Sequence, residues 1–145
     1  MEYSDSYLKS ILQRSRVIVM VGASPRRDRP SHGVMGFLQS AGYRVLPVNP
    51  GQAGQKILGE KVYASLEEVA ADHGPEVDMI DIFRRPEAVP DLVAEALERF
   101  PKLSAIWMQL GVVSPEGAAL AHLRDVGVVM DRCPKIEYPR LLGAA

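Results

Sequence analysis

Five short apolar runs, separated by segments of helical character, constrain most strongly what this chain can fold into. The runs are 16–21, 43–48, 77–83, 103–110 and 127–130. They show almost no polar alternation, which is typical of strands buried on both faces of a parallel sheet. Strands that alternate with helices favour a doubly wound α/β fold with right-handed crossovers. We therefore expect a five-stranded parallel sheet with helices on both faces, in three layers.

The connecting segments supply helices with recognisable ends. Helices are expected over 4–14, 32–41, a short stretch from 65, 86–99 and a stretch from 115. Ser31 is a candidate N-cap and Gly42 a candidate C′ residue of the second helix. Pro86 should open the fourth helix, and 52–63 should be irregular because it is rich in glycine. Residues 1–145 are expected to form one Rossmann-like domain.

Composition limits the partners of this chain. The formal net charge of the 145 residues is −1, so no strong global field attracts nucleic acid or an anionic membrane. No apolar run reaches the roughly 18 residues of a membrane span, and no secretory signal is visible. Cys133 is the one cysteine, which excludes a disulfide within the chain and fits a reducing cytoplasm. We expect a cytoplasmic protein with neither nucleic acid nor membrane as partner.

Ligands of doubly wound sheets bind beyond the carboxyl ends of the strands. The residues that follow four of the predicted strands are therefore the candidate site. They are Gly22, Ala23, Ser24, Pro25, Arg26, Asn49, Pro50, Phe83, Arg84, Arg85, Gln109, Leu110 and Gly111.

Arginines near the first and third strand ends indicate an anionic ligand. Gly22 permits a close approach of backbone to phosphate, and Arg26, Arg27 and Arg29 follow it. The alternative is a solvated surface loop. Arg84 and Arg85 stand just before an expected helix, where a cation opposes the helix dipole unless an anion lies nearby.

The end of the second strand disfavours a nicotinamide dinucleotide. Such sites use an aspartate or glutamate there to bind the ribose hydroxyls, and this chain has Asn49. Asn49 could instead serve only a turn. We find no catalytic constellation and no metal-ligand spacing among the three histidines. Cys133, between Arg132 and Lys135, is interpreted as a buried side chain, with a reactive thiol as the alternative.

Five motifs together resemble a known family. They are 21–24 (Val-Gly-Ala-Ser), 48–50 (Val-Asn-Pro), 59–63 (Gly-Glu-Lys-Val-Tyr), 107–111 (Trp-Met-Gln-Leu-Gly) and 130–137 (Met-Asp-Arg-Cys-Pro-Lys-Ile-Glu). In order and spacing the chain resembles the CoA-binding domain of the succinyl-CoA synthetase alpha subunit. It is more similar still to small stand-alone bacterial CoA-binding proteins, over about 10–142.

The resemblance implies coenzyme A extended over the strand ends. Gly22, Ala23 and Ser24 would hold phosphate, and Asn49 and Pro50 would border the nucleotide. Arg44 matches a basic position that contacts CoA in the family. The stretch 83–85 would flank the adenine, and 109–111 the other side.

The chain departs from the synthetase in two ways. Its glycine turn carries a longer, arginine-rich insert, and the domain with the phosphorylated histidine is missing. The resemblance therefore implies CoA or acyl-CoA binding without catalysis, and a protein partner is undefined. Three alternatives stay open: an NAD(P)-type dinucleotide-binding protein, the non-catalytic subunit of a split acyl-CoA ligase, and an interaction module with a vestigial pocket.

Overall fold

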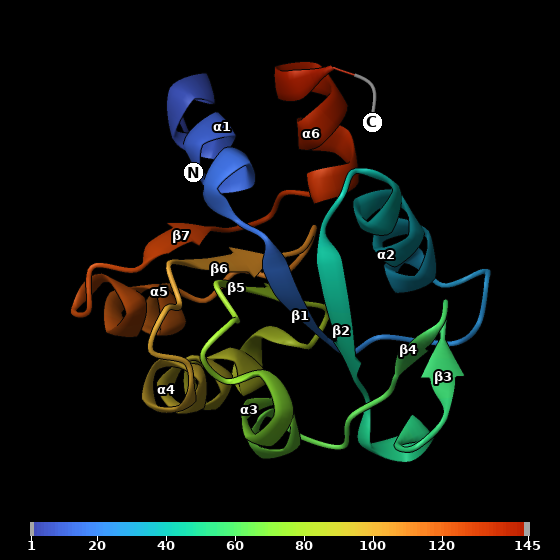
Figure 1. Ribbon diagram of the computed structural model, residues 1–145. Coiled ribbons are helices and arrows are strands. Elements are labelled where there is room, and N and C mark those ends of the chain that lie inside the picture. The colour runs from blue at the N-terminus through green and yellow to red at the C-terminus, as the bar shows by residue number, and fades with distance from the viewer. Residues whose placement is uncertain (1, 144–145) are drawn as a thin grey trace.

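A parallel sheet forms the centre of the molecule, as the sequence predicts. The computed structural model describes residues 2–143. The strands follow the order β2-β1-β5-β6-β7 (Figure 1). They are β1 (Val17–Val21), β2 (Arg44–Val48), β5 (Met79–Ile82), β6 (Ala105–Met108) and β7 (Gly127–Val129). Each strand lies inside its predicted range, and all the neighbouring pairs are parallel.

Helices cover both faces of the sheet and complete the three layers. One face carries α1 (Asp5–Arg14), α2 (Pro30–Ser40) and α6 (Pro134–Leu142). The other carries α3 (Leu66–His73), α4 (Val89–Arg99) and α5 (Pro115–His122), as Figure 1 shows. Alternate strand residues serve the two faces: Met20 and Trp107 pack under the first set of helices, and Val19 and Ile106 under the second. The α/β fold class is confirmed.

The start of α2 differs from the prediction. The helix begins at Pro30 with Arg29 as an N-cap that makes no side-chain capping bond. Ser31 is therefore inside the first turn, where its buried Oγ accepts a hydrogen bond from the backbone N–H of Ser24 at 3.0 Å. Proline fits the first helical position because its φ is already helical and it has no N–H to leave unpaired. The expected C′ residue Gly42 has the predicted left-handed backbone, with φ +102°.

The segment expected to be irregular contains short elements. After a 3-10 turn, η1 (Pro50–Gln52), the strands β3 (Lys56–Ile57) and β4 (Glu60–Lys61) form a hairpin. The chain then runs beside β2, where the N–H of Tyr63 donates to the carbonyl of Pro47 at 2.9 Å. The outer edge of β2 is thus hydrogen-bonded.

Two helical regions also differ from the prediction. Pro86 opens a 3-10 turn, η2 (Pro86–Ala88), and the α-helix begins only at Val89. Helix α6 forms where no helix is predicted; Pro134 stands at its first position and Pro139 lies inside it. The Tyr138 ring packs edge-on against the rings of Phe37 and Tyr43, which holds α6 on the sheet face despite the internal proline.

Tyr3, just before α1, and Tyr7, within it, bind the opposite edge of the sheet. The Tyr7 hydroxyl donates to the carbonyl of Val128 and accepts from its N–H, both at 2.8 Å. The Tyr3 hydroxyl accepts from the N–H of Met130 at 2.9 Å. These bonds fix the first helix along the last strand.

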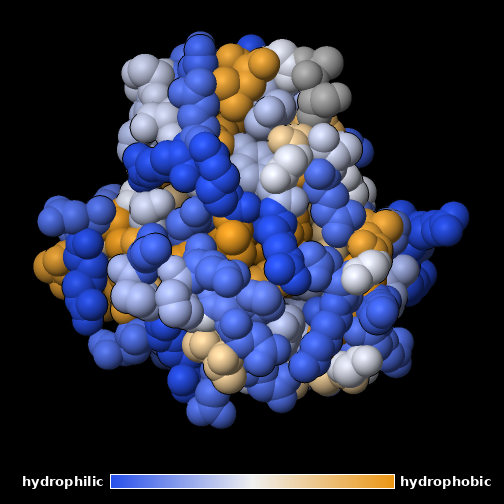
Figure 2. All heavy atoms as spheres, in the orientation of Figure 1, coloured by the Kyte–Doolittle hydropathy of each residue, from blue (hydrophilic) through white to orange (hydrophobic). Residues whose placement is uncertain are grey.

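The face of the molecule seen in Figure 2 is mostly hydrophilic. Hydrophobic atoms show at its left edge, near α5, and at its top, between α1 and α6. Leu123, which directly follows α5, is 82% exposed. Among residues 2–143, no helix combines the length and the apolar character needed to cross a bilayer.

Candidate ligand-binding site

The strand order places a candidate site between β1 and β5. From β1 the chain crosses to β2 on one side, and β5 pairs with β1 on the other. Such a reversal leaves a crevice beyond the carboxyl ends of the strands, where α/β proteins bind ligands. The segments after β1, β2, β5 and β6 meet at this edge.

Gly22 is required by the close packing of this turn. Its φ is +89°, and a Cβ built there would lie 2.5 Å from the carbonyl oxygen of Phe83. The N–H groups of Gly22 and Ala23 both donate to the carbonyl of Val48, at 3.0 and 3.2 Å. The Ser24 N–H donates to Ser31, as described above. These N–H groups therefore hold the turn together and are already engaged within the protein.

Asn49 joins the ends of β1 and β2. Its Nδ2 donates to the carbonyl of Ala23 at 2.7 Å, and its Oδ1 accepts from the N–H of Gly51 at 2.9 Å. Both ends of the side-chain amide are thus engaged within the protein. Asn49 therefore stabilises the turn, as one interpretation of the sequence expected, and it also lines two of the cavities described next.

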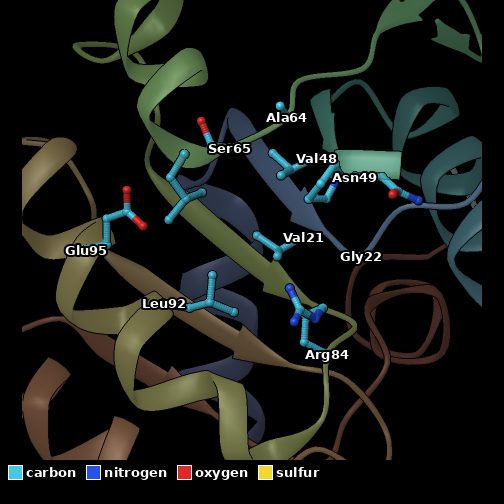
Figure 3. Close-up of a pocket in the computed structure, with 11 residues that line it drawn as sticks. Val21, Gly22, Val48, Asn49, Ala64, Ser65, Arg84, Leu92 and Glu95 are labelled. Carbon is cyan, nitrogen blue, oxygen red and sulfur yellow. The ribbon is translucent and has the colours of Figure 1, made fainter. Parts of the chain in front are cut away.

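Three adjoining cavities form a cleft across this edge, which we call the carboxyl-edge cleft. The β2-side cavity, of about 410 Å³, lies over Val48, Asn49, Ser65 and Leu92 (Figure 3). The central cavity, of about 330 Å³, lies over the turn 22–24 with Arg26 and Arg29. The β6-side cavity, of about 490 Å³, is lined by 83–86, 109–112, Pro30, Val34 and Cys133.

Shared walls connect the three cavities. Gly22 and Asn49 line both the β2-side and the central cavity, and Phe83 and Pro30 line both the central and the β6-side cavity. Arg84 lines the two outer cavities, and Figure 3 shows its guanidinium directed toward Val21 and Gly22. An extended ligand could therefore contact all three cavities at once.

The cleft carries unpaired positive charge. Among residues 2–143, no carboxylate forms an ion pair with Arg29, Arg84 or Arg85. Arg26 pairs with Asp28 at 3.0 Å, and both of these side chains are exposed. Guanidinium groups without a partner at a cleft favour phosphate, which they bind through two parallel hydrogen bonds.

Two buried polar side chains lack a hydrogen-bond partner near the β6-side cavity. Gln109 is 6% exposed and lines this cavity, and its Oε1 has no partner in the described chain. Asp81 lies deeper, between Met20 and Trp107 in the sheet, and neither carboxylate oxygen has a partner there. Burial away from water raises the pKa of Asp81 to about 8, because the charged form loses its hydration.

The structure brings the predicted site residues together at the cleft, except for Arg44 and for Pro25, which lines none of the three cavities. Arg44 is the first residue of β2, at the amino end of the strand, and it pairs in register with Val17. Its guanidinium forms an ion pair with Glu60 at 3.0 Å, and this hydrogen-bonded carboxylate raises the pKa of Arg44. The expected contact with ligand is therefore not supported, because Arg44 lies at the edge of the sheet opposite the cleft.

Sequence reasoning missed several residues of the cleft. Ser65 and Leu92 come from the helices beneath the sheet, and Pro30 and Ser31 from the first turn of α2. Ser65 and Pro30 carried an indirect signal, because serine is a common N-cap and proline suits the first helical position, so both mark helix starts. Within residues 2–143, no group of three or more metal-ligating side chains is found.

The chain resembles known proteins along most of its length. Residues 16–139 match the family described as CoA binding domain. Protein YneT from Bacillus subtilis is 38% identical over 135 residues, which cover 93% of this chain and 94% of YneT. Cell-free ID.343 from Thermus thermophilus superimposes with a TM-score of 0.85 at 34% identity, covering 97% of this chain and 100% of that one. A hypothetical protein from Pyrococcus horikoshii gives a TM-score of 0.85 at 31% identity, covering 97% and 94%.

Proposed function

The chain belongs to the family of proteins built on a CoA-binding domain, and from this premise we propose that its carboxyl-edge cleft binds coenzyme A, free or acylated. One observation carries the proposal. Arginines that form no ion pair within residues 2–143 line a cleft at the point where the strand order reverses. A ligand with several phosphates and a long arm fits both the charge and the length of this cleft.

We assign a different part of coenzyme A to each of the three cavities. The central cavity takes the diphosphate, because Arg26 and Arg29 line it and Arg84 lies beside it. The β2-side cavity takes the adenosine between Val48 and Leu92. The β6-side cavity takes the pantetheine arm. This differs from the expectation that Phe83 flanks the adenine, because Phe83 faces the central and β6-side cavities.

Asn49 supports CoA over NAD as the ligand. A dinucleotide site places a carboxylate at the end of the second strand to accept from the ribose hydroxyls. Here the Oδ1 and Nδ2 atoms of Asn49 are both bound to backbone groups of the protein. Asn49 is also uncharged, so it is a weaker acceptor for ribose hydroxyls than a carboxylate would be.

We also propose that the isolated chain binds without catalysing a reaction, in a bacterial cytoplasm. The ligase chemistry of a succinyl-CoA synthetase would then need a partner subunit. Incubating the purified chain with ATP, CoA and succinate or acetate tests this, and steady formation of a thioester would contradict it.

Calorimetric titration with CoA, acetyl-CoA, NAD and NADP tests the ligand directly. We expect CoA and acetyl-CoA to bind and NAD to bind more weakly. An affinity for NAD or NADP equal to that for CoA would overturn the proposal and favour the dinucleotide alternative.

A further inference from the structure

The segment after β7 holds a thiol at the wall of the β6-side cavity. Cys133 is only 6% exposed, and it lines this cavity together with Phe83 and Gln109. Backbone bonds fix the segment: the N–H of Arg132 donates to the carbonyl of Met108 at 3.3 Å, and Trp107 Nε1 donates to the carbonyl of Arg132 at 2.9 Å. The thiol is therefore held in place, with the cavity as its route of access.

Gln109 supplies, independently of Cys133, an unpartnered polar atom at the wall of the same cavity. Its side chain is almost fully buried, and its Oε1 accepts no hydrogen bond in the described chain. A buried acceptor without a donor is unfavourable, and native proteins rarely leave one unsatisfied. An amide N–H of a bound ligand would satisfy it.

The remaining walls define the kind of group that fits. Val34, Phe83 and Val112 are apolar, and the charged side chains of Arg84 and Arg85 are exposed. The cavity also adjoins the arginine-lined central cavity at Phe83 and Pro30. A mostly apolar arm with amide groups, tethered to phosphates, matches this arrangement. Pantetheine is such an arm, and it ends in a thiol.

We propose that Cys133 is a site of covalent modification that forms a mixed disulfide with the thiol end of CoA. The inference rests on the proposed function, since it requires CoA in the cleft. It adds a redox-dependent step: the ligand is held covalently under oxidising conditions and released by thiol reductants.

The step balances as a thiol–disulfide exchange with CoA disulfide. The Cys133 thiol loses its proton to solvent, and the thiolate attacks one sulfur of the CoA disulfide. A Cys133–CoA disulfide bond forms while the original S–S bond breaks, and the departing CoA thiolate takes up a proton. Cys133 is also the N-cap of α6, so negative charge on Sγ lies near the positive end of that helix dipole.

The wild-type protein can be tested without any substitution, because Cys133 is its one cysteine. The reduced protein is mixed with CoA disulfide or with glutathione disulfide at equal concentration, and adduct formation is followed by intact mass. Binding in the cleft raises the effective concentration of the sulfur, so we expect CoA disulfide to react about tenfold faster or more. Excess acetyl-CoA, whose sulfur is blocked, should occupy the cleft and slow the reaction. Dithiothreitol should remove the adduct.

Calorimetry with acetyl-CoA separates failure of this inference from failure of the proposed function. If acetyl-CoA binds but does not protect Cys133, or if both disulfides react equally fast, the covalent step is wrong and CoA binding stands. If acetyl-CoA does not bind, both proposals fall. The variant Cys133→Ala has no thiol and serves as the blank of the mass measurement, so a mass increase of one CoA in that variant would overturn the assignment to Cys133.

Discussion

The Cα of Gly22 lies so close to Phe83 that a Cβ on it would meet the Phe83 carbonyl oxygen at 2.5 Å. This contact joins the ends of the two central strands on either side of the proposed ligand path. The close packing there is a property of the backbone, so a side-chain adjustment cannot relieve it.

Gly22→Ala should therefore be strongly destabilising. The left-handed backbone and the forced shift of Phe83 together should lower the free energy of unfolding by about 2 to 4 kcal/mol. Gly59→Ala is the matched control, because Gly59 has φ +85° and open space around it. It should lose only about 1 to 2 kcal/mol, the backbone contribution. Urea unfolding measures both, and equal losses would show that the Phe83 contact is unimportant.

Arg84 and Arg85 should contribute directly to CoA affinity. Each charge-assisted contact to phosphate is worth about 1.5 to 3 kcal/mol, so replacing both with alanine should weaken binding by at least about tenfold. Added salt should weaken wild-type binding more than binding by the double variant, because screening reduces the attraction. Arg124→Ala is the control, since Arg124 is exposed beyond α5 and pairs with Glu98. Unchanged affinity in the double variant would make these arginines solvated surface charges.

The variant Arg44→Ala tests whether Arg44 contacts the ligand, as the family resemblance implies. We expect unchanged CoA affinity, because Arg44 pairs with Glu60 at the amino end of β2. The loss of this partly exposed ion pair should change the free energy of unfolding by less than about 1 kcal/mol. A clear loss of affinity in calorimetry would mean that the ligand reaches around the sheet edge.

Asp81 should make stability fall as pH rises. Its folded pKa of about 8 lies above the ordinary value of 3.8, so the folded protein binds the proton more tightly than the unfolded chain. Between these two pH values the free energy of unfolding should decrease by up to about 1.4 kcal/mol per pH unit, and it should level off above pH 8.

The variant Asp81→Asn keeps the shape of the side chain and cannot ionise. The difference in unfolding free energy between wild type and Asp81→Asn, measured in urea at several pH values from 5 to 9, isolates this contribution. A difference that does not vary with pH would show that Asp81 is solvated in the folded state.

The strands and the cleft were predictable because both depend on local patterns. Runs such as 17–21 are continuously apolar, which is the pattern of a strand that is buried on both faces. The cleft followed from one rule of α/β folds, applied to whatever residues come after the strands. Arg44 lies away from the cleft because it is the first residue of β2, about 13 Å from the carboxyl end of the strand at 3.3 Å per residue.

Other features depend on contacts that the sequence does not display. Serine is a common N-cap residue, yet the Ser31 hydroxyl instead accepts a hydrogen bond from the N–H of Ser24. The helix α6 contains Pro139 and forms because the ring of Tyr138 packs on α2 and the start of β2. The β3–β4 hairpin turns at Leu58, which adopts φ +48° although leucine rarely does. In each case tertiary packing overrides the local preference.

Tyr7 of α1 and the segment beside β2 limit how copies of this protein can associate. Tyr7 occupies both outward backbone groups of Val128, and Tyr63 bonds with the outer side of β2 at Pro47. Open strand edges are templates on which further chains can add, and here hydroxyl groups and a returning segment occupy them. Native molecules are thereby protected against edge-to-edge polymerisation, a protection that would be lost if α1 detached.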